Sequence, residues 1–241
     1  MTKKLALVAV AVAMIAGGAW LSNGGMGVSA ARADGTTTTT TTTATGTTAA
    51  PAPAPAPTAT DTKAPVIPEM SIGNPDAKVT VTEYLSFTCP HCAEFHAAVY
   101  PDIKKNYIDT GKIKFTIQEV YFDKYGLWAG MMAHCGGPMR YFGIVDILYN
   151  TQNDWLGTND PNVVVANLKK IGKTAGMTDA ELNTCMNDGK MAQALVAQFQ
   201  KTSQADKIEG TPSFVVDGVT HSNMSYDEFS KLLDAELAKN K

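Results

Sequence analysis

The sequence lacks any excess of positive charge. Its 241 residues include 20 Lys or Arg and 23 Asp or Glu, which gives a formal net charge of −3 at pH 7. Lys3, Lys4 and Arg32 are the only charged residues before residue 34, so the remainder has a balance of 17 − 23 = −6. Proteins that bind nucleic acid present a basic face to the phosphates. The charge therefore argues against a nucleic-acid partner.

Cysteine is also scarce, with four residues in the chain. Two of them, Cys89 and Cys92, form a Cys-x-x-Cys motif, and Cys135 and Cys185 stand apart from it. A structural zinc site made of cysteines needs a second such motif, so we predict no metal and no cofactor. The first 70 residues do not look globular, and the remaining stretch of about 170 is long enough for a hydrophobic core without disulfide staples.

Large apolar side chains are missing from two low-complexity runs, Thr36–Thr43 and Pro51–Pro57. Such runs cannot offset the entropy that is lost on ordering. We predict that residues 34–70 form a disordered linker, loose in its Thr part and extended like polyproline in its Pro-Ala part. A plain spacer is the simplest role for it, and glycosylation or contact with the cell wall is the alternative.

The N-terminus has the pattern of an export signal. Lys3 and Lys4 precede the apolar stretch Leu5–Leu21, and two small-x-small sites follow before residue 34. We predict that residues 1–33 are a cleaved signal peptide, with an uncleaved membrane anchor as the alternative because the stretch reaches the lower edge of a membrane span. No cysteine lies near it, which excludes a lipoprotein. Either reading places the body in an oxidising compartment, where disulfides persist.

The remainder has the pattern of an α/β protein. Alternating apolar residues predict strands at Val79–Phe87 and 113–120, with a helix from Pro90 to about Tyr107 between them. Two further strands are predicted near the end, at Ser213–Val216 and Val219–Thr220, on either side of an Asp-Gly turn. A helix that begins with the capping-box pattern Ser225-x-x-Glu228 follows them.

The middle of this region has few strand signals. We predict that residues 71–122 and 206–241 share one sheet and that residues 123–205 are an inserted all-helical domain. The helices expected in the insertion are Gly126–Cys135, Pro138–Tyr149, Pro161–Lys173, Thr178–Asn187 and Gly189–Gln204.

The tetrapeptide Cys89-Pro90-His91-Cys92 lies between a predicted strand and a predicted helix. Its two thiols are therefore three residues apart in the first turn of a helix, where free N–H groups and the helix dipole favour negative charge. The thiolate is the reactive form of cysteine. We predict that Cys89 is the attacking thiolate and Cys92 the buried resolving thiol, a pair suited to reversible disulfide exchange.

Two segments carry a resemblance to a known family: Glu83–Cys92 and Gly210–Phe214. With the helical insertion between them and the export signal, the sequence resembles DsbA-like thiol–disulfide oxidoreductases of the thioredoxin superfamily. The likeness covers about Ser71 to Lys239. It implies a thioredoxin fold, that is, a central mixed sheet flanked by helices, here with an inserted all-helical domain. Periplasmic oxidases of this family usually have Val before the late proline, whereas Thr211 is more like the isomerase and reductase relatives.

The resemblance also implies roles for individual residues. Pro212 is expected to follow a cis peptide bond and to face the dithiol together with Thr211, whose backbone would pair with an extended substrate. Glu83, in the middle of a strand, is expected to be partly buried and to shuttle protons to Cys92; a solvent-facing charge is the alternative. His91 would stabilise the Cys89 thiolate through its ring and a neighbouring N–H group.

For the remaining cysteines and histidines we expect structural roles. Cys135 and Cys185 are the two cysteines left over in an oxidising compartment, so we predict a structural disulfide between them; a regulatory redox pair is the alternative. In the chain-entropy model, closing a loop of about 50 residues contributes roughly 4 kcal/mol. His96, His134 and His221 have no matching ligand set and are interpreted as structural or solvated.

The function expected from these features is the oxidation of exported proteins in the periplasm. The partners would be reduced, unfolded exported proteins and, by family analogy, a membrane quinone-linked partner that reoxidises the dithiol. A monomer is expected, because the Thr/Pro/Ala segment cannot fold into the dimerisation domain that isomerases of the superfamily carry. The alternatives are a reductase or isomerase using the same site, and a metal carrier or holdase using the same cleft.

Overall fold

The computed structural model describes residues 65–158 and 160–240. The predicted signal peptide and most of the predicted linker lie outside these residues. Within them, one five-stranded sheet has the order β1-β3-β2-β4-β5. Strands β2 and β3 run parallel and the other neighbouring pairs are antiparallel. The strands are β1 (Met70–Gly73), β2 (Val79–Leu85), β3 (Ile113–Glu119), β4 (Ser213–Val216) and β5 (Val219–Ser222).

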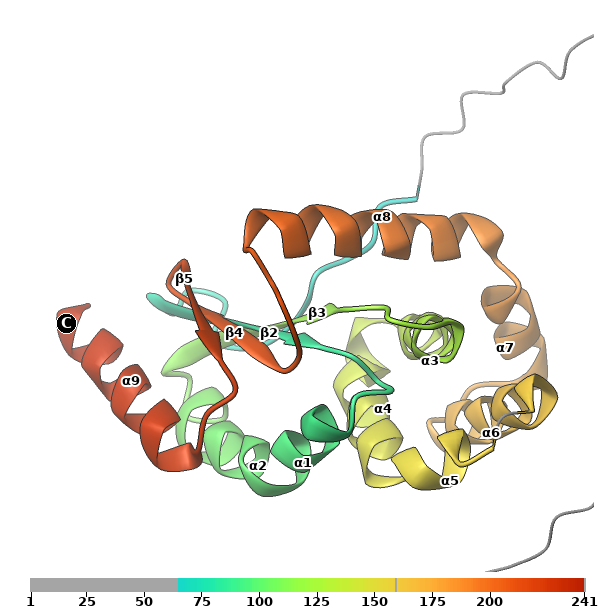
Figure 1. The fold of residues 1–241 in the computed structure, drawn as a ribbon, viewed down its shortest axis with the longest axis horizontal. Coiled ribbons are helices and arrows are strands. Elements are labelled where there is room, and N and C mark those ends of the chain that lie inside the picture. The colour runs from blue at the N-terminus through green and yellow to red at the C-terminus, as the bar shows by residue number, and fades with distance from the viewer. Residues whose placement is uncertain (1–64, 159, 241) are drawn as a thin grey trace, which may run out of the picture. The chain divides into compact units, whose positions relative to one another are not determined.

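Helices cover both faces of the sheet, with α8 on one side and α1, α2 and α9 on the other (Figure 1). This arrangement confirms the predicted mixed sheet flanked by helices. Six helices, α3 to α8, follow β3 and precede β4. The helices are α1 (Pro90–Ala98), α2 (Tyr100–Ile103), the π-helix η1 (Lys104–Ile108), α3 (Lys124–Cys135), α4 (Pro138–Asn150), α5 (Gln152–Leu156), α6 (Pro161–Thr174), α7 (Asp179–Met186), α8 (Gly189–Ala205) and α9 (Tyr226–Lys239).

The structure differs from the sequence predictions at three places. The single helix expected from Pro90 to Tyr107 is divided into α1, α2 and η1, because Pro101 lacks the N–H that would continue the hydrogen-bond ladder. Strand β1 is absent from the sequence predictions, which place its first residue, Met70, in the linker. Helix α5 was also missed, since five residues are too few for a periodic apolar pattern.

Aromatic packing fixes α1 and α9 against the sheet. The ring of Phe214 on β4 lies 4.8 Å, centroid to centroid, from Phe95 on α1 and also 4.8 Å from Phe229 on α9. All three side chains are buried. The predicted capping box at Ser225 and Glu228 is present and starts α9. The start of α1 is therefore held firmly at the carboxyl end of β2.

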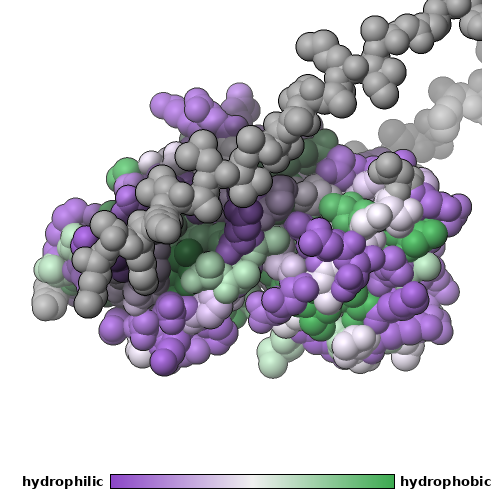
Figure 2. All heavy atoms as spheres, turned by 60° about the horizontal axis from the view of Figure 1, so that its bottom comes forward, coloured by the Kyte–Doolittle hydropathy of each residue, from purple (hydrophilic) through white to green (hydrophobic). Residues whose placement is uncertain are grey.

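The face of the molecule seen in Figure 2 is mostly hydrophilic, and its hydrophobic residues lie in separate small patches. Among the described residues, the most exposed large hydrophobic side chains are those of Met139, Val66 and Phe122. Phe122 lies in the segment that connects β3 to α3. Within residues 65–158 and 160–240, no helix combines the length and apolar character that a membrane span requires.

Candidate active site

The dithiol lies where β2 ends and α1 begins. Cys89 is the N-cap residue of α1, with extended backbone angles, and Pro90 follows at the start of the helix, where a missing N–H is tolerated. Cys92, one turn later, is completely buried, whereas Cys89 is half-buried. Both are free thiols in the structure. One sulfur is thus open to a reaction partner and the other is shielded.

The surroundings of Cys89 favour its thiolate. They lower its pKa from 9.0 to about 5, chiefly through a hydrogen bond from the Cys92 thiol. Burial opposes this change, while the side chain of Thr211 and the backbone N–H groups of Cys92 and His91 add to it. These N–H groups belong to the first turn of α1, where no carbonyl of the helix can accept them. These surroundings therefore favour the thiolate form of Cys89 at neutral pH.

Cys92 is affected in the opposite direction. Burial is the main cause that raises its pKa, and the hydrogen bond to Cys89 and the charge of Glu83 raise it further. The shared proton therefore stays on Cys92 while the charge stays on Cys89. Any reaction that breaks or forms the Cys89–Cys92 bond must supply a proton to a buried sulfur or remove one from it.

The ring of His91 is hydrogen-bonded to Glu94. Its Nδ1 atom lies 3.0 Å from Oε2 of Glu94, and the side chain is 68% exposed. This hydrogen bond is the main cause that raises the pKa of His91. The ring and the backbone N–H of His91 were both expected to stabilise the Cys89 thiolate. The backbone N–H is the part of His91 that lowers the pKa of Cys89.

Glu83 and His96 form a buried pair beneath the dithiol. Glu83 lies on β2 and is fully buried, more than the sequence suggested, and Nε2 of His96 on α1 lies 3.1 Å from each of its carboxylate oxygens. The ring of His96 stacks on Tyr149, with centroids 4.4 Å apart. His96 is buried and hydrogen-bonded, which agrees with its interpretation as a structural residue. The sequence did not predict that its hydrogen-bond partner is Glu83.

The segment before β4 forms the other wall of the site. The Thr211–Pro212 peptide bond is cis, and the Sγ atom of Cys89 lies 3.4 Å from the carbonyl oxygen of Thr211. The Thr211 hydroxyl is buried, and the group on which the Thr211 side chain acts is the Cys89 thiol, whose pKa it lowers. A cleft of about 410 Å³ opens beside this segment, and its lining includes Lys207, Thr211 and His221. The backbone of Thr211 therefore lies beside Cys89.

Sequence reasoning missed the residue that holds the catalytic loop from the insertion. Gln152, at the start of α5, is buried and donates from Nε2 to the carbonyl oxygens of Phe87 at 2.8 Å and Cys89 at 3.0 Å. Tyr149 on α4 donates to the carbonyl oxygen of Ser86 at 3.1 Å. No motif marks either residue, because the contacts depend on how α4 and α5 pack beside the loop.

A second cysteine pair lies in the insertion. Cys135 at the end of α3 and Cys185 on α7 are joined by a disulfide bond, with Cα atoms 5.8 Å apart. Beside it, Nε2 of the buried His134 lies 2.8 Å from Oε1 of Glu119 at the end of β3. Among the described residues, no group of three or more metal-binding side chains comes together.

The fold and the paired thiols define a class that comparison with known proteins identifies. A family model described as thioredoxin matches residues 66–235. A Rickettsia bellii protein provisionally named a protein-disulfide oxidoreductase is 36% identical over 72% of this chain and 66% of its own length. Disulfide bond formation protein D of Bacillus subtilis is 26% identical over 69% of this chain and 76% of its own length.

Solved structures agree. The crystal structure of Wolbachia pipientis alpha-DsbA1 superposes with a TM-score of 0.66 and 28% sequence identity, covering 73% of this chain and 94% of that one. The chain therefore belongs to the thioredoxin superfamily, in its DsbA-like branch of thiol–disulfide oxidoreductases. It spans slightly less than two thirds of the length of the rickettsial relatives, with 66% in one case and 61% in another.

Proposed function

We propose that this protein is a dithiol oxidase that introduces disulfide bonds into exported proteins through Cys89 and Cys92. The observation that carries the proposal is the opposite behaviour of the two thiols. The pKa of Cys89 is lowered to about 5, and that of Cys92 is raised. Stabilising the thiolate stabilises the reduced protein, so the oxidised form passes its disulfide on readily.

The reaction follows from this asymmetry. A substrate thiolate attacks Sγ of Cys89 in the oxidised protein, the Cys89–Cys92 bond breaks, and Sγ of Cys92 leaves with the electron pair and takes up a proton. A second substrate thiolate then attacks the mixed disulfide at the substrate sulfur. Cys89 leaves as a thiolate, the substrate is oxidised by two electrons, and the dithiol is reduced by two. Glu83 is the buried group placed to exchange the proton with Cys92.

Thr211 and Pro212 would bind the substrate. The segment before β4 lies 3.4 Å from Sγ of Cys89 at the Thr211 carbonyl, so an extended substrate can pair with this backbone while its sulfur reaches Cys89. We further propose that the protein is a monomer in the periplasm, exported by residues 1–33, with a tether to the inner membrane as the alternative in which these residues stay uncleaved. A membrane quinone-linked partner would reoxidise the dithiol, by family analogy.

A reductase or isomerase is the second candidate, because Thr211 is the residue type found before this proline in those relatives. Two assays separate the candidates. In the first assay, the oxidised full chain is mixed with a reduced, unfolded protein, and the formation of disulfide bonds in that protein is measured. In the second, the reduced chain is tested as a catalyst for the reduction of insulin, with dithiothreitol as the electron donor. We expect rapid oxidation and weak insulin reduction. Strong insulin reduction without oxidation of the unfolded protein would reverse the assignment.

Titration of Cys89 directly tests the observation on which the proposal rests, the lowered pKa of this thiol. Alkylation of Cys89 by iodoacetamide should show a midpoint near pH 5. The thiolate stabilises the folded reduced protein fully above the unfolded-state pKa near 9.0, and this contribution is lost as the pH falls through about 5. The reduced form should therefore unfold at higher denaturant than the oxidised form at pH 7, and the difference should shrink toward pH 5. A midpoint near that of a free thiol would contradict the proposal.

A further inference from the structure

Cys92 cannot exchange a proton with solvent directly, because it is completely buried. Its neighbour Glu83 is equally buried, so a proton held there also needs a way out. The structure gives Glu83 a hydrogen-bonded partner, His96, whose Nε2 lies 3.1 Å from both carboxylate oxygens. An imidazole can accept a proton on one nitrogen and release one from the other. The other nitrogen of His96, Nδ1, is buried and has no partner among the described residues.

One face of α4 runs from this pair toward the surface. Phe142, Asp146 and Tyr149 lie at positions i, i+4 and i+7 of the helix, so they share a face. At one end, the ring of Tyr149 stacks on His96 at 4.4 Å. At the other end, Phe142 lines a pocket at the surface. Asp146, which is half-buried, lies between them.

Electrostatic effects agree with this placement. Burial raises the pKa of Asp146, while the charges of His96 and Lys104 lower it. Burial likewise raises the pKa of Tyr100, and the charges of Asp146 and Glu83 raise it further. The ring of Tyr100 lies 4.6 Å from that of His96. Asp146 is thus within electrostatic range of the buried pair.

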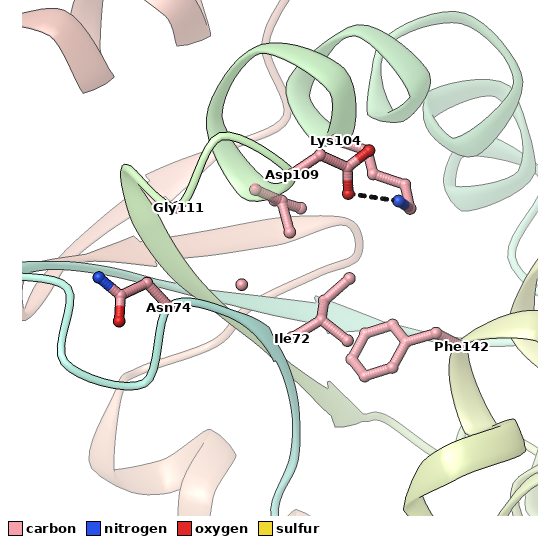
Figure 3. Close-up of a pocket in the computed structure, with 8 residues that line it drawn as sticks. Ile72, Asn74, Lys104, Asp109, Gly111 and Phe142 are labelled. Carbon is pink, nitrogen blue, oxygen red and sulfur yellow. Dashed lines mark hydrogen bonds and ion pairs between the residues drawn. The ribbon is translucent and has the colours of Figure 1, made fainter.

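The pocket at the end of this face has a volume of about 490 Å³. Figure 3 shows Lys104 and Asp109 on one side of it, joined by their ion pair at 2.5 Å, and Phe142 on another side together with Ile72. Lys104 lines the pocket and also acts on Asp146. Asp146 is not one of the lining residues, but it is half-buried and lies one turn along α4 from Phe142, which lines the pocket.

We propose that His96 and Asp146 carry the Cys92 proton between buried Glu83 and the solvent at the pocket lined by Lys104 and Phe142. The inference rests on the proposed function. When Cys92 leaves as a thiolate, Glu83 gives it a proton, His96 replaces the proton on Glu83, and Asp146 restores the proton of His96 from solvent. During reoxidation, the same proton travels outward. His96 and Asp146 are positioning residues, since they act through Glu83.

The groups that face His96 come from four elements. Glu83 lies on β2, and Cys92 lies on the same helix as His96. Tyr100 is contributed by α2, and Tyr149 and Asp146 are contributed by α4. Among these, Asp146 is the half-buried acidic group, and the others are buried. This makes Asp146 the acidic group through which a proton can reach solvent on this side of the pair.

The test measures the reduction of the oxidised full chain by glutathione at pH values from 4.5 to 8, with alkylation and mass measurement at each time point. We compare His96→Asn, which keeps a donor to Glu83 but cannot carry a proton, with Asp146→Asn. General acid–base catalysis contributes about 10²–10⁴-fold, so we expect each variant to react at least about 10-fold more slowly and both to lose the same step from the pH profile. The alkylation midpoint of Cys89 should stay at the wild-type value.

Two matched controls keep the test specific. His134→Asn breaks the other buried Glu–His pair, and Asp109→Asn removes a different carboxylate at the same pocket. Both should keep the wild-type rate and pH profile. A wild-type profile in Asp146→Asn, which sits at a half-buried position and should fold, would overturn the relay while leaving the oxidase intact. A wild-type protein that does not exchange with glutathione would overturn the proposed function, and the relay with it.

Discussion

The dithiol region and the helical insertion each contain one cysteine pair beside one buried Glu–His pair, yet the two regions behave differently. Beside the dithiol, the carboxylate of Glu83 has His96 as its hydrogen-bond partner and acts on the thiol of Cys92. In the second pair, Glu119 at the end of β3 is bonded to two residues of the insertion, His134 at 2.8 Å and the hydroxyl of Tyr141 at 2.5 Å. Under the proposed function, the first carboxylate lies next to a thiol that gains and loses a proton, whereas one oxygen of the second carboxylate accepts hydrogen bonds from two side chains.

The spacing of the cysteines separates the two regions further. Cys89 and Cys92 lie one turn apart on a single helix, so a bond between them restrains very little of the chain. Cys135 and Cys185 are 50 residues apart and connect α3 to α7. The first bond can therefore open and close without unfolding the protein, whereas the second holds two helices together. Under the proposed function, the disulfide bond takes part in a reaction in one region and stabilises the fold in the other.

The largest effect should come from Cys89→Ser. Loss of the nucleophile should abolish oxidation of a reduced, unfolded protein, because no other thiolate in the site is exposed. The matched control is the double variant Cys135→Ser with Cys185→Ser, assayed well below its unfolding temperature, which should retain most of the activity. If that double variant were as inactive as Cys89→Ser, the assignment of catalysis to Cys89 and Cys92 and of stability to Cys135 and Cys185 would be wrong.

The same pair of replacements at 135 and 185 should have its main effect on stability. For a loop of about 50 residues the chain-entropy model predicts a loss of roughly 4 kcal/mol in the free energy of unfolding. Urea unfolding followed by circular dichroism measures this. Reducing only Cys89 and Cys92 with glutathione provides the control, and a loss below about 1 kcal/mol in the double variant would show that α3 and α7 do not need the bond.

Glu119→Gln should destabilise the protein by about 3 kcal/mol, as expected when one partner of a buried ion pair is removed. Burial alone would raise the pKa of Glu119, but the charge of His134 and the hydrogen bonds from His134 and Tyr141 together lower it in the folded protein. The sign follows directly: this stability is present above the unfolded-state value near 4.5 and is lost as the pH falls toward the lower folded-state value. Acid unfolding of wild type should thus be steeper below pH 4.5 than that of Glu119→Gln, and equal slopes would contradict the assignment.

The smallest effect is expected from His91→Ser. Its exposed ring is bonded to Glu94 and its backbone N–H persists in the variant, so the pKa of Cys89 should rise by less than about one unit. Thr211→Val is the contrast, because a hydrogen bond to a charged group contributes about 1.5–3 kcal/mol, or roughly one to two pKa units. Iodoacetamide alkylation measures both, and a larger shift in His91→Ser than in Thr211→Val would reverse their order.

Sequence reasoning reached the mixed sheet, the thiol pair and the segment that opposes it, because each depends on a local pattern or on a motif with a fixed neighbourhood. It stopped where function depends on contacts between distant elements. His96 was recognised only as a histidine without ligands, since nothing local indicates that α1 lays it on Glu83 of β2. The orientation of the His91 ring was missed for a related reason: Glu94, one turn along the helix, competes for it.

The hydrogen bonds of Gln152 carry a consequence for how such proteins can diverge or be rebuilt. This amide reaches across from α5 to the carbonyls of Phe87 and Cys89, so the reactive turn is partly shaped by a segment more than sixty positions downstream. If the tetrapeptide Cys89–Cys92 were placed in a scaffold without α5, its sequence would be preserved but the hydrogen bonds from Gln152 would be lost. Chimeras that exchange the helical block should therefore alter the reactivity of sulfurs that they never replace.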